Sequence, residues 1–265
     1  MLRFGVRAVR LGCVGFGAAF SLSLPMPARA QATASVPGTV ADTADKTGTN
    51  PANLQTSVDL FNRFASVDDQ LFVDQVTWRY AQAFAGHRMR ARVDLPLTFG
   101  NLTGRVEAGF GDVAPGWEWL AAARGRVGVL AGVDLTFDTS SNDALAVGHH
   151  TAAPAIGVVV VPRSDTVISL RYDQRLSLNT VDGRADVNKG TLEGSVVRRG
   201  SDDWWVRATA SLNVDVEQST TWSRLRGEWG KVLFGGFSTW VQAGGGLGAS
   251  RPADWTVDFG FRVVR

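Results

Sequence analysis

Residues 203–217, DWWVRATASLNVDVE, alternate between apolar and polar side chains along their whole length. One face reads Trp204, Val206, Ala208, Ala210, Leu212, Val214 and Val216, and the other reads Trp205, Arg207, Thr209, Ser211, Asn213, Asp215 and Glu217. Successive side chains of a β-strand point to opposite faces, so this pattern predicts a strand with one apolar and one polar face. The stretch is long for a strand of a soluble sheet, and its length is near that needed to cross a bilayer at a tilt.

Residues 1–30 have the composition of an export signal. Arg3, Arg7 and Arg10 form a basic start, residues 11–24 are apolar and small, and 28–30 read Ala-Arg-Ala. These features predict a signal peptide that is cleaved near Ala30. A transmembrane anchor is the weaker alternative, because the apolar run is short and ends in a cleavage motif.

Removal of this leader changes the charge balance of the chain. Four arginines and no acidic residue leave with it, so 23 of the 27 basic residues remain against 25 acidic residues, a net charge of −2. The mature chain therefore shows no basic excess that would indicate nucleic-acid binding. The sole cysteine, Cys13, also leaves, which excludes a cysteine nucleophile and a thiolate metal site.

Residues 31–57 are rich in Ala, Thr, Asp, Gly and Pro, with few large apolar groups. Such a stretch buries too little surface to become ordered by itself, so it is predicted to be a flexible periplasmic tail. The remainder, 58–265, contains the alternating segments. They are residues 58–64, 70–84, 88–99, 111–124, 126–138, 151–161, 165–178, 187–198, 203–217, 220–233, 237–247 and 254–265.

The connections between these segments alternate between tight and long, as in bacterial barrels with short periplasmic turns and longer outer loops. The sequence therefore predicts an all-β, transmembrane, antiparallel up-and-down β-barrel of about twelve strands, with ten as the fallback. A soluble periplasmic β-sandwich is the alternative, but its strands would be shorter and its turns would lack this rhythm.

The cost of charge in lipid assigns the two faces of each strand. An arginine at the middle of the bilayer costs roughly 2–4 kcal/mol, so the apolar faces are predicted to contact lipid and the charged faces to line the lumen. The predicted lumen-lining charges are Arg88, Arg90, Arg92, Asp94, Glu118, Arg126, Asp134, Arg171, Asp173, Arg175, Arg207, Asp215, Arg224, Arg226, Glu228 and Arg262. Two interpretations stay open: cross-strand pairs that fill a narrow lumen, and a polar path that favours anions.

Several tryptophans lie near the predicted strand ends. Tryptophan is enriched at both membrane–water interfaces, so an interfacial girdle is predicted. Its members are Trp117, Trp119, Trp204, Trp205, Trp222 and Trp255.

Residues 109–119, GFGDVAPGWEW, resemble the G-x-G-D strand start of the outer-membrane barrels grouped with the MetA pathway of phenol degradation, a transporter-like family. Further similarities are residues 71–75 with Tyr80, residues 90–96, the loop at 139–148, and Ala153-Pro154. Phe137 and Asp138 depart from the family pattern, which has a proline there, and Ala146 replaces a glycine. The resemblance implies a barrel that passes hydrophobic or aromatic compounds, an analogy of fold rather than of a site.

These observations predict a passive channel or facilitator of the bacterial outer membrane for small compounds, aromatic or anionic ones among them. The alternatives are a non-conducting structural or surface-exposed barrel and, with less support, a lipid-modifying barrel enzyme that uses His149 and His150. No catalytic residue, metal site or cofactor is predicted. The expected partners are outer-membrane lipid, a small-molecule substrate, and the barrel-assembly machinery through the final strand, with no nucleic acid.

Overall fold

The computed structural model describes Val40 and residues 45–68, 70–142, 145–146, 148–179 and 186–265. The predicted signal peptide and its cleavage site lie outside these residues and stay predictions. Within the described residues the chain forms thirteen β-strands. They are β1 (Ser57–Ser66), β2 (Phe72–Phe84), β3 (Met89–Gly100), β4 (Glu107–Phe110), β5 (Ala114–Arg124), β6 (Val127–Thr136), β7 (Thr151–Arg163), β8 (Thr166–Ser177), β9 (Asn188–Arg199), β10 (Trp204–Asp215), β11 (Thr220–Phe234), β12 (Phe237–Leu247) and β13 (Trp255–Val264).

The strands close into one antiparallel ring. Strands that are neighbours in the sequence pair with each other, except that β4 and β5 both pair with β3, and β1 pairs with both β2 and β13. The β1–β13 ladder runs from Ser57 opposite Val264 to Ser66 opposite Trp255. This closure removes the open sheet edge that lipid would not tolerate. The predicted segment 58–64 is therefore a full strand, and it completes the barrel.

One wall position beside β3 is shared by β4, of four residues, and β5, of eleven residues, so thirteen strands make a twelve-stranded barrel. β3 pairs with β4 at one end (Leu97 opposite Phe110) and with β5 at the other (Asp94 opposite Ala114). The break falls opposite Pro96, which has no backbone N–H to continue the ladder. The Pro96 carbonyl still accepts a hydrogen bond of 2.9 Å from the Gly111 amide. The twelve-strand prediction is confirmed, whereas residues 100–110, which lie between two predicted strands, contain the additional strand β4.

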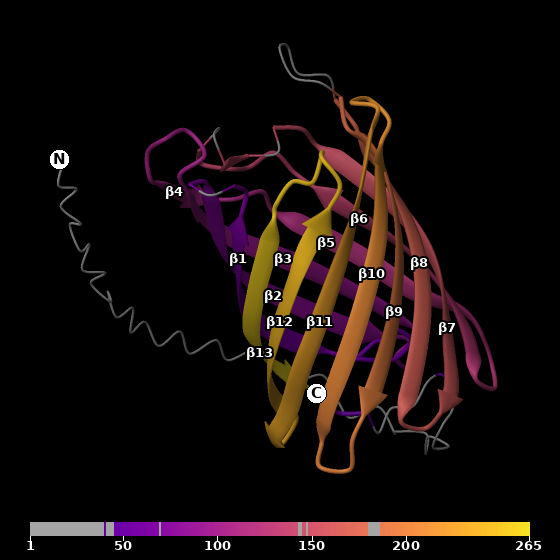
Figure 1. The fold of residues 1–265 in the computed structure, drawn as a ribbon. Helices are drawn as coiled ribbons and strands as arrows, with labels where there is room; N and C mark the ends of the chain where they lie inside the picture. Colours follow the sequence, from indigo (N-terminus) through magenta and orange to yellow (C-terminus); the bar gives the residue numbers. More distant parts are fainter. Residues whose placement is uncertain (1–39, 41–44, 69, 143–144, 147, 180–185) are drawn as a thin grey trace. The chain divides into compact units, whose positions relative to one another are not determined.

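The barrel has two unlike ends, which we call the turn end and the loop end (Figure 1). At the turn end, β2–β3, β5–β6, β7–β8, β9–β10 and β11–β12 are joined by connections of two to four residues. Gly235 and Gly236 form one of these turns with φ angles of 52° and 85°, a conformation that glycine adopts without strain. The loop end carries longer connections, including residues 137–150 and 178–187.

Alternation along each strand separates an apolar outer face from a more polar inner face. On β1, Val58 and Leu60 are 39% and 48% exposed on the outside, whereas Asp59 between them is 2% exposed on the inside. The outer faces of the other strands likewise expose large apolar side chains, such as Ile156, Leu170 and Phe259. No helix in the described part of the chain is long and apolar enough to span a membrane.

The described part of the predicted flexible tail is packed inside the barrel instead. We call residues 45–56 the plug segment. Asn50, Ala52 and Leu54 are each at most 2% exposed, and the segment lies at the turn end in Figure 1. The expectation of a flexible tail is wrong for these residues, because it assumed that order requires a large apolar surface. A polar segment inside a barrel can satisfy its hydrogen bonds with the polar inner wall.

Candidate functional site in the barrel lumen

The plug segment crosses the lumen, because it contacts strands and turns on several sides of the barrel. The Asp45 carboxylate lies 3.0 Å from Arg199 on β9. The carbonyl of Thr49 accepts a hydrogen bond of 3.2 Å from Arg207 on β10, and that of Gly48 accepts one of 3.0 Å from Arg262 on β13. The carbonyl of Leu54 lies 3.3 Å from His87 Nδ1 in the β2–β3 turn.

Side chains within the plug segment replace secondary structure. The Asn50 side chain donates to the carbonyl of Val40 (2.9 Å) and accepts from the amide of Ala52 (3.0 Å). The Gln55 side chain donates to the carbonyl of Asp45 (2.6 Å). The Asp45 carboxylate also accepts from the backbone amide of Thr47 (2.9 Å). Asn, Asp and Thr side chains that bond nearby backbone groups hold the chain in compact turns.

An apolar cluster seals the plug segment against the wall. Leu54 and Ala52 of the plug pack with Val40 and with inward side chains of the turn-end half of the barrel. These wall residues are Leu120, Val159, Val161, Val167, Val197, Trp205 and Val232, with Leu130 and Trp240 partly buried beside them. The rule that apolar side chains face lipid therefore fails at the turn end, because here the inner face has an apolar partner.

Trp205 is the largest member of this cluster and needs a gap in the neighbouring strand. A Cβ atom on Gly230 would lie 2.1 Å from the Trp205 ring, so the absence of a side chain at Gly230 provides the space that the indole occupies. The indole Nε1 donates a hydrogen bond of 2.7 Å to Glu228. Trp205 thus links the apolar seal to the charged wall above it.

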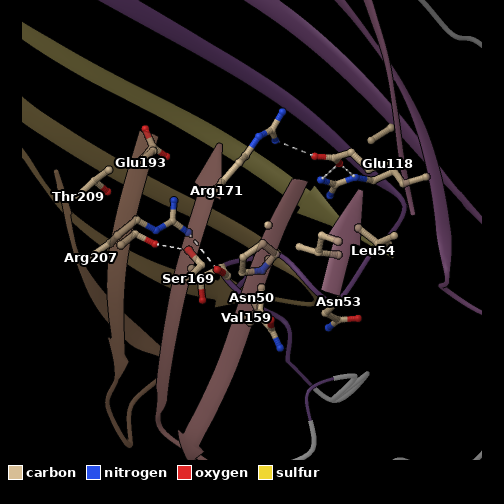
Figure 2. Close-up of a pocket in the computed structure, with 18 of the residues that line it drawn as sticks. Asn50, Asn53, Leu54, Glu118, Val159, Ser169, Arg171, Glu193, Arg207 and Thr209 are labelled. Atoms are coloured by element: carbon tan, nitrogen blue, oxygen red, sulfur yellow. Dashed lines mark hydrogen bonds and ion pairs between the residues drawn. The ribbon is translucent and has the colours of Figure 1, made fainter. Parts of the chain in front are cut away.

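A cavity of about 370 Å³ lies in the lumen between the plug segment and the charged walls. Asn50 and Leu54 lie on one side of it, facing Arg171, Glu193 and Arg207 on the strands (Figure 2). Phe61 and Trp240 also line the cavity, and their ring centroids are 6.1 Å apart. Its volume falls in the range of small-molecule sites.

Glu118 on β5 is the centre of the largest charge cluster in this wall. Its Oε2 accepts from Arg90 at 2.5 and 2.9 Å, and its Oε1 lies 3.4 Å from Arg171 and 3.6 Å from Arg92. Asp134 on β6 binds the same two arginines, at 2.7 Å to Arg92 and 3.0 Å to Arg171. Three guanidinium groups from β3 and β8 therefore share two carboxylates, which fixes their direction across the lumen.

The remaining charges of the wall are also mostly paired. The pairs are Arg63–Asp258 (2.9 Å), Arg79–Asp94 (2.6 Å), Lys189–Asp215 (3.7 Å), Arg207–Glu228 (3.3 Å), Arg226–Glu193 (2.5 Å) and Arg262–Asp59. Partly buried charges are stable in a protein when they are paired in this way.

The structure places the predicted lumen charges in three groups. Those in the cluster and the pairs above lie on the inner wall. Asp173, Arg175 and Arg224 also occupy inward positions of β8 and β11, without an ion pair in the described part of the chain. Arg88 and Arg126 are exposed in turns at the rim, where they donate to the carbonyls of Leu120 (3.2 Å) and Pro162 (2.6 Å). Those two do not line the lumen, because the strands begin one residue later.

Sequence reasoning missed Lys189 of the inner wall, which pairs with Asp215, and five charged residues that line the cavity. The five are Asp59, Arg63, Arg79, Glu193 and Asp258. The alternation of the sequence could have identified them. Asp59 and Arg63 lie at odd-numbered positions of β1, whereas the outward Val58 and Leu60 lie at even-numbered positions, so Asp59 and Arg63 face inward. Glu193 lies on β9, between the inward positions of Thr191 and Ser195.

The structure divides the six predicted girdle tryptophans between the outer and inner faces of the wall, and the interfacial girdle itself stays a prediction. Trp117, Trp119 and Trp255 are 40%, 36% and 47% exposed on the outer face, and Trp204 is half-buried. Trp205 (1% exposed) and Trp222 (7%) point into the barrel and are not girdle residues. Trp222 lies under the ammonium group of Lys189, which is 4.8 Å from its ring centroid. Trp205 is two positions from the inward Arg207, and Trp222 is two positions from the inward Arg224. Because side chains two positions apart on a strand share a face, both tryptophans point inward although they lie near strand ends.

The two histidines of the 137–150 loop do not converge on one site. His149 is buried, with its Nδ1 3.2 Å from the carbonyl of Asn179. The His150 Nδ1 accepts a hydrogen bond of 3.0 Å from the Asp138 amide, and its ring packs edge-on against Phe137. Both side chains thus hold the loop in place. Among the described residues, no group of three His, Cys, Asp or Glu side chains could hold a metal ion.

The fold is that of solved outer-membrane channels. The barrel is similar to an outer-membrane channel from Pseudomonas putida F1, with a TM-score of 0.64 and 11% identity over 82% of this chain and 100% of that one. It is similar to the NanC porin (TM-score 0.57, 12% identity, 79% and 99%) and the KdgM porin (0.56, 10%, 78% and 98%). No protein-family model and no curated protein matches the sequence. The protein is therefore an outer-membrane-type β-barrel in fold, and its resemblance to the MetA-grouped family stays a prediction.

Proposed function

We propose that this protein is a passive outer-membrane channel or facilitator for small, negatively charged compounds. The observation that carries the proposal is the cavity of about 370 Å³ in a closed barrel whose inner wall presents arginines from many strands. Arg90, Arg92 and Arg171 line this cavity around Glu118. A row of guanidinium groups offers successive weak sites to a carboxylate, which is what passage through a selective pore requires.

Solved proteins of the same fold support this proposal. They include a channel and two porins, and a KdgM porin has been solved in complex with disordered oligogalacturonate. On this proposal the turn end faces the periplasm and the loop end faces outward, as in bacterial barrels. The outer apolar face would contact lipid, and the final strand β13 would engage the assembly machinery.

A second candidate function is a non-conducting surface barrel. The observation in its favour is the plug segment, which spans the turn end and is sealed by Leu54, Val159 and Trp205. If the plug segment stays in place, the charged pairs above it would serve to fill the lumen rather than to conduct. A lipid-modifying enzyme has less support, since His149 and His150 bond the loop itself.

Single-channel recording of the refolded protein in a planar bilayer tests the proposal. We expect stable current steps and, under a KCl gradient, a reversal potential that shows preference for chloride. Heat-modifiable migration on a gel serves as the folding control. A folded protein without current steps would contradict the channel and favour the surface barrel.

A further inference from the structure

The inner face of β11 carries an arginine that differs from its neighbours. Arg224 pairs across the sheet with Ser211 on β10 and with Gly246 on β12, so neither adjacent inward position supplies a carboxylate. We propose that Arg224, with Arg63 and Arg226, forms an anion-binding subsite in the lumen wall that takes the carboxylate of a small solute. This inference rests on the proposed channel function and adds a defined binding position to it.

The charge balance around Arg224 leaves one guanidinium free for a ligand. Arg63 lies 2.9 Å from Asp258, and Arg226 lies 2.5 Å from Glu193. Within the part of the chain that the structure describes, no carboxylate lies within ion-pair distance of Arg224. The charges of Arg226 and Arg63 repel it, and Asp258 and Glu193 attract it only from a distance. Three guanidinium groups therefore face two carboxylates, and an added anion would balance the group.

An anion could reach this group from the cavity, because Arg63 and Arg226 are among the residues that line it. β12 has glycines at its inward positions 244 and 246, beside Arg226 and Arg224. A Cβ atom on Gly244 would lie 2.6 Å from the Arg226 Cγ, so the stem of Arg226 lies directly over this glycine. Glycine in a strand interior often marks a close approach of another group. Here it allows Arg226 to lie flat against the wall, beside Arg224.

Other arginines of the wall are poorer candidates for a ligand. Arg90, Arg92 and Arg171 are already held by Glu118 and Asp134. An incoming carboxylate would have to compete with two fixed carboxylates there. At Arg224 it would find a partly buried donor that has no carboxylate partner to displace in the part of the chain that the structure describes. Because a guanidinium binds a carboxylate through two parallel hydrogen bonds, the subsite favours carboxylates over spherical anions.

Calorimetric titration of the detergent-refolded protein with citrate tests the subsite independently of conduction. We expect saturable citrate binding, no binding of glycerol as the uncharged control, and at least about tenfold weaker citrate binding in Arg224→Gln, because one charged hydrogen-bond pair is lost. Arg198→Gln removes an exposed arginine at the turn end, whose only carboxylate neighbour among the described residues is Asp165, and should leave citrate affinity unchanged. Heat-modifiable migration checks that each variant is folded.

A second variant guards against a folding defect in Arg224→Gln. Arg224→Lys keeps the charge but not the two-pronged geometry, so its citrate affinity should fall between those of the wild type and Arg224→Gln. Equal affinity in all three proteins, or no citrate binding by the wild type, would overturn the subsite even if the protein conducts. Conversely, Arg224-dependent citrate binding by a protein without current steps would retain the subsite and remove the channel function.

Discussion

Two halves of the same lumen differ in what their strands turn inward. At the turn end, β9 presents Val197 and β10 presents Trp205 to the plug segment. Farther from the turn end, β9 presents Glu193, four residues before Val197, and β10 presents Arg207, two residues after Trp205. Both line the cavity. The alternation is continuous through both halves, so the difference lies in the inward residue type alone. On these two strands, Val197 and Trp205 pack in the apolar cluster with the plug segment, and Glu193 and Arg207 line the cavity.

The two halves of the lumen are stabilised by different interactions. The turn-end half is held by packing, with Leu54 and Val159 each 1% exposed. The loop-end half is held by ion pairs whose side chains keep partial exposure, such as Arg171 at 34%. Packed apolar contacts resist displacement, whereas partly exposed ion pairs exchange with solutes and salt. We therefore expect substitutions in the turn-end half to change conductance and stability, and those in the loop-end half to change ion selectivity.

Deletion of residues 45–55 should have the largest effect on the difference between the two halves. Removal of the plug segment empties the turn-end half, so single-channel conductance in a planar bilayer should rise several-fold. Asp45→Asn is a milder form of the same change, because it weakens the buried pair with Arg199 and should give intermittent openings. Unchanged conductance in the deletion variant would mean that the plug segment does not limit the flow of ions.

The position of the plug segment can be followed chemically. Cys13 is the sole cysteine of the chain, so a Cys13→Ser, Ala52→Cys protein reports on one site. Ala52 is fully buried, and a maleimide added to the folded barrel should react slowly. Adding Asp45→Asn should speed the reaction. Equal labelling rates would show that this ion pair does not retain the segment.

Trp205→Ala and Trp204→Ala are a matched pair of variants that compares the stability contributions of the inner and outer faces of β10. Trp205 is 1% exposed and fills the space above Gly230. Its loss should lower the free energy of unfolding by about 3–5 kcal/mol. Trp204 is half-buried on the outer face, so its loss should cost only about 1 kcal/mol. Urea titration of the refolded barrels gives both values, and similar losses would contradict the assignment of Trp205 to the seal.

Glu118→Gln should have the smallest effect and one confined to selectivity. Among the described residues, the change leaves Arg92 and Arg171 paired with Asp134, and it leaves Arg90 with no carboxylate within 4 Å. The reversal potential under a KCl gradient should shift toward chloride, while conductance stays close to that of the wild type. Glu107→Gln, at the loop-end strand β4, is the control and should leave the reversal potential unchanged. A shift toward potassium would contradict a lumen whose selectivity is set by these arginines.

The fold was predictable to a large extent because a β-strand has a period of two. Alternation at residues such as Ile168, Leu170 and Tyr172 marks a strand and its outer face wherever the segment lies in the sheet. The cost of charge in lipid then assigns Arg171 and Glu118 to the inside. Parity placed Trp205 and Trp222 inside as well, and the girdle prediction failed for them because it used position along the strand instead.

The plug segment was not predictable in the same way. The sequence of residues 45–56 shows no hydrophobic periodicity from which a packing partner could be inferred. The segment is ordered by contacts with Arg199, Arg207 and Arg262, which lie more than 140 positions away. The same holds for the shared carboxylates of the cluster. The sequence placed Arg90, Glu118 and Arg171 on one face, but only the closure of the barrel brought β3, β5 and β8 within ion-pair distance.

The amino-acid sequence by itself determined the strands, their two faces, the closed barrel of twelve, and the sign of the charges inside it. These follow from local alternation and from transfer energies that act on each residue separately. Only the tertiary structure shows that the plug segment lies in the lumen, which arginines are paired, and that Arg224 has no carboxylate within ion-pair distance among the described residues. Those outcomes depend on distances between segments far apart in the chain, which a periodic pattern does not encode.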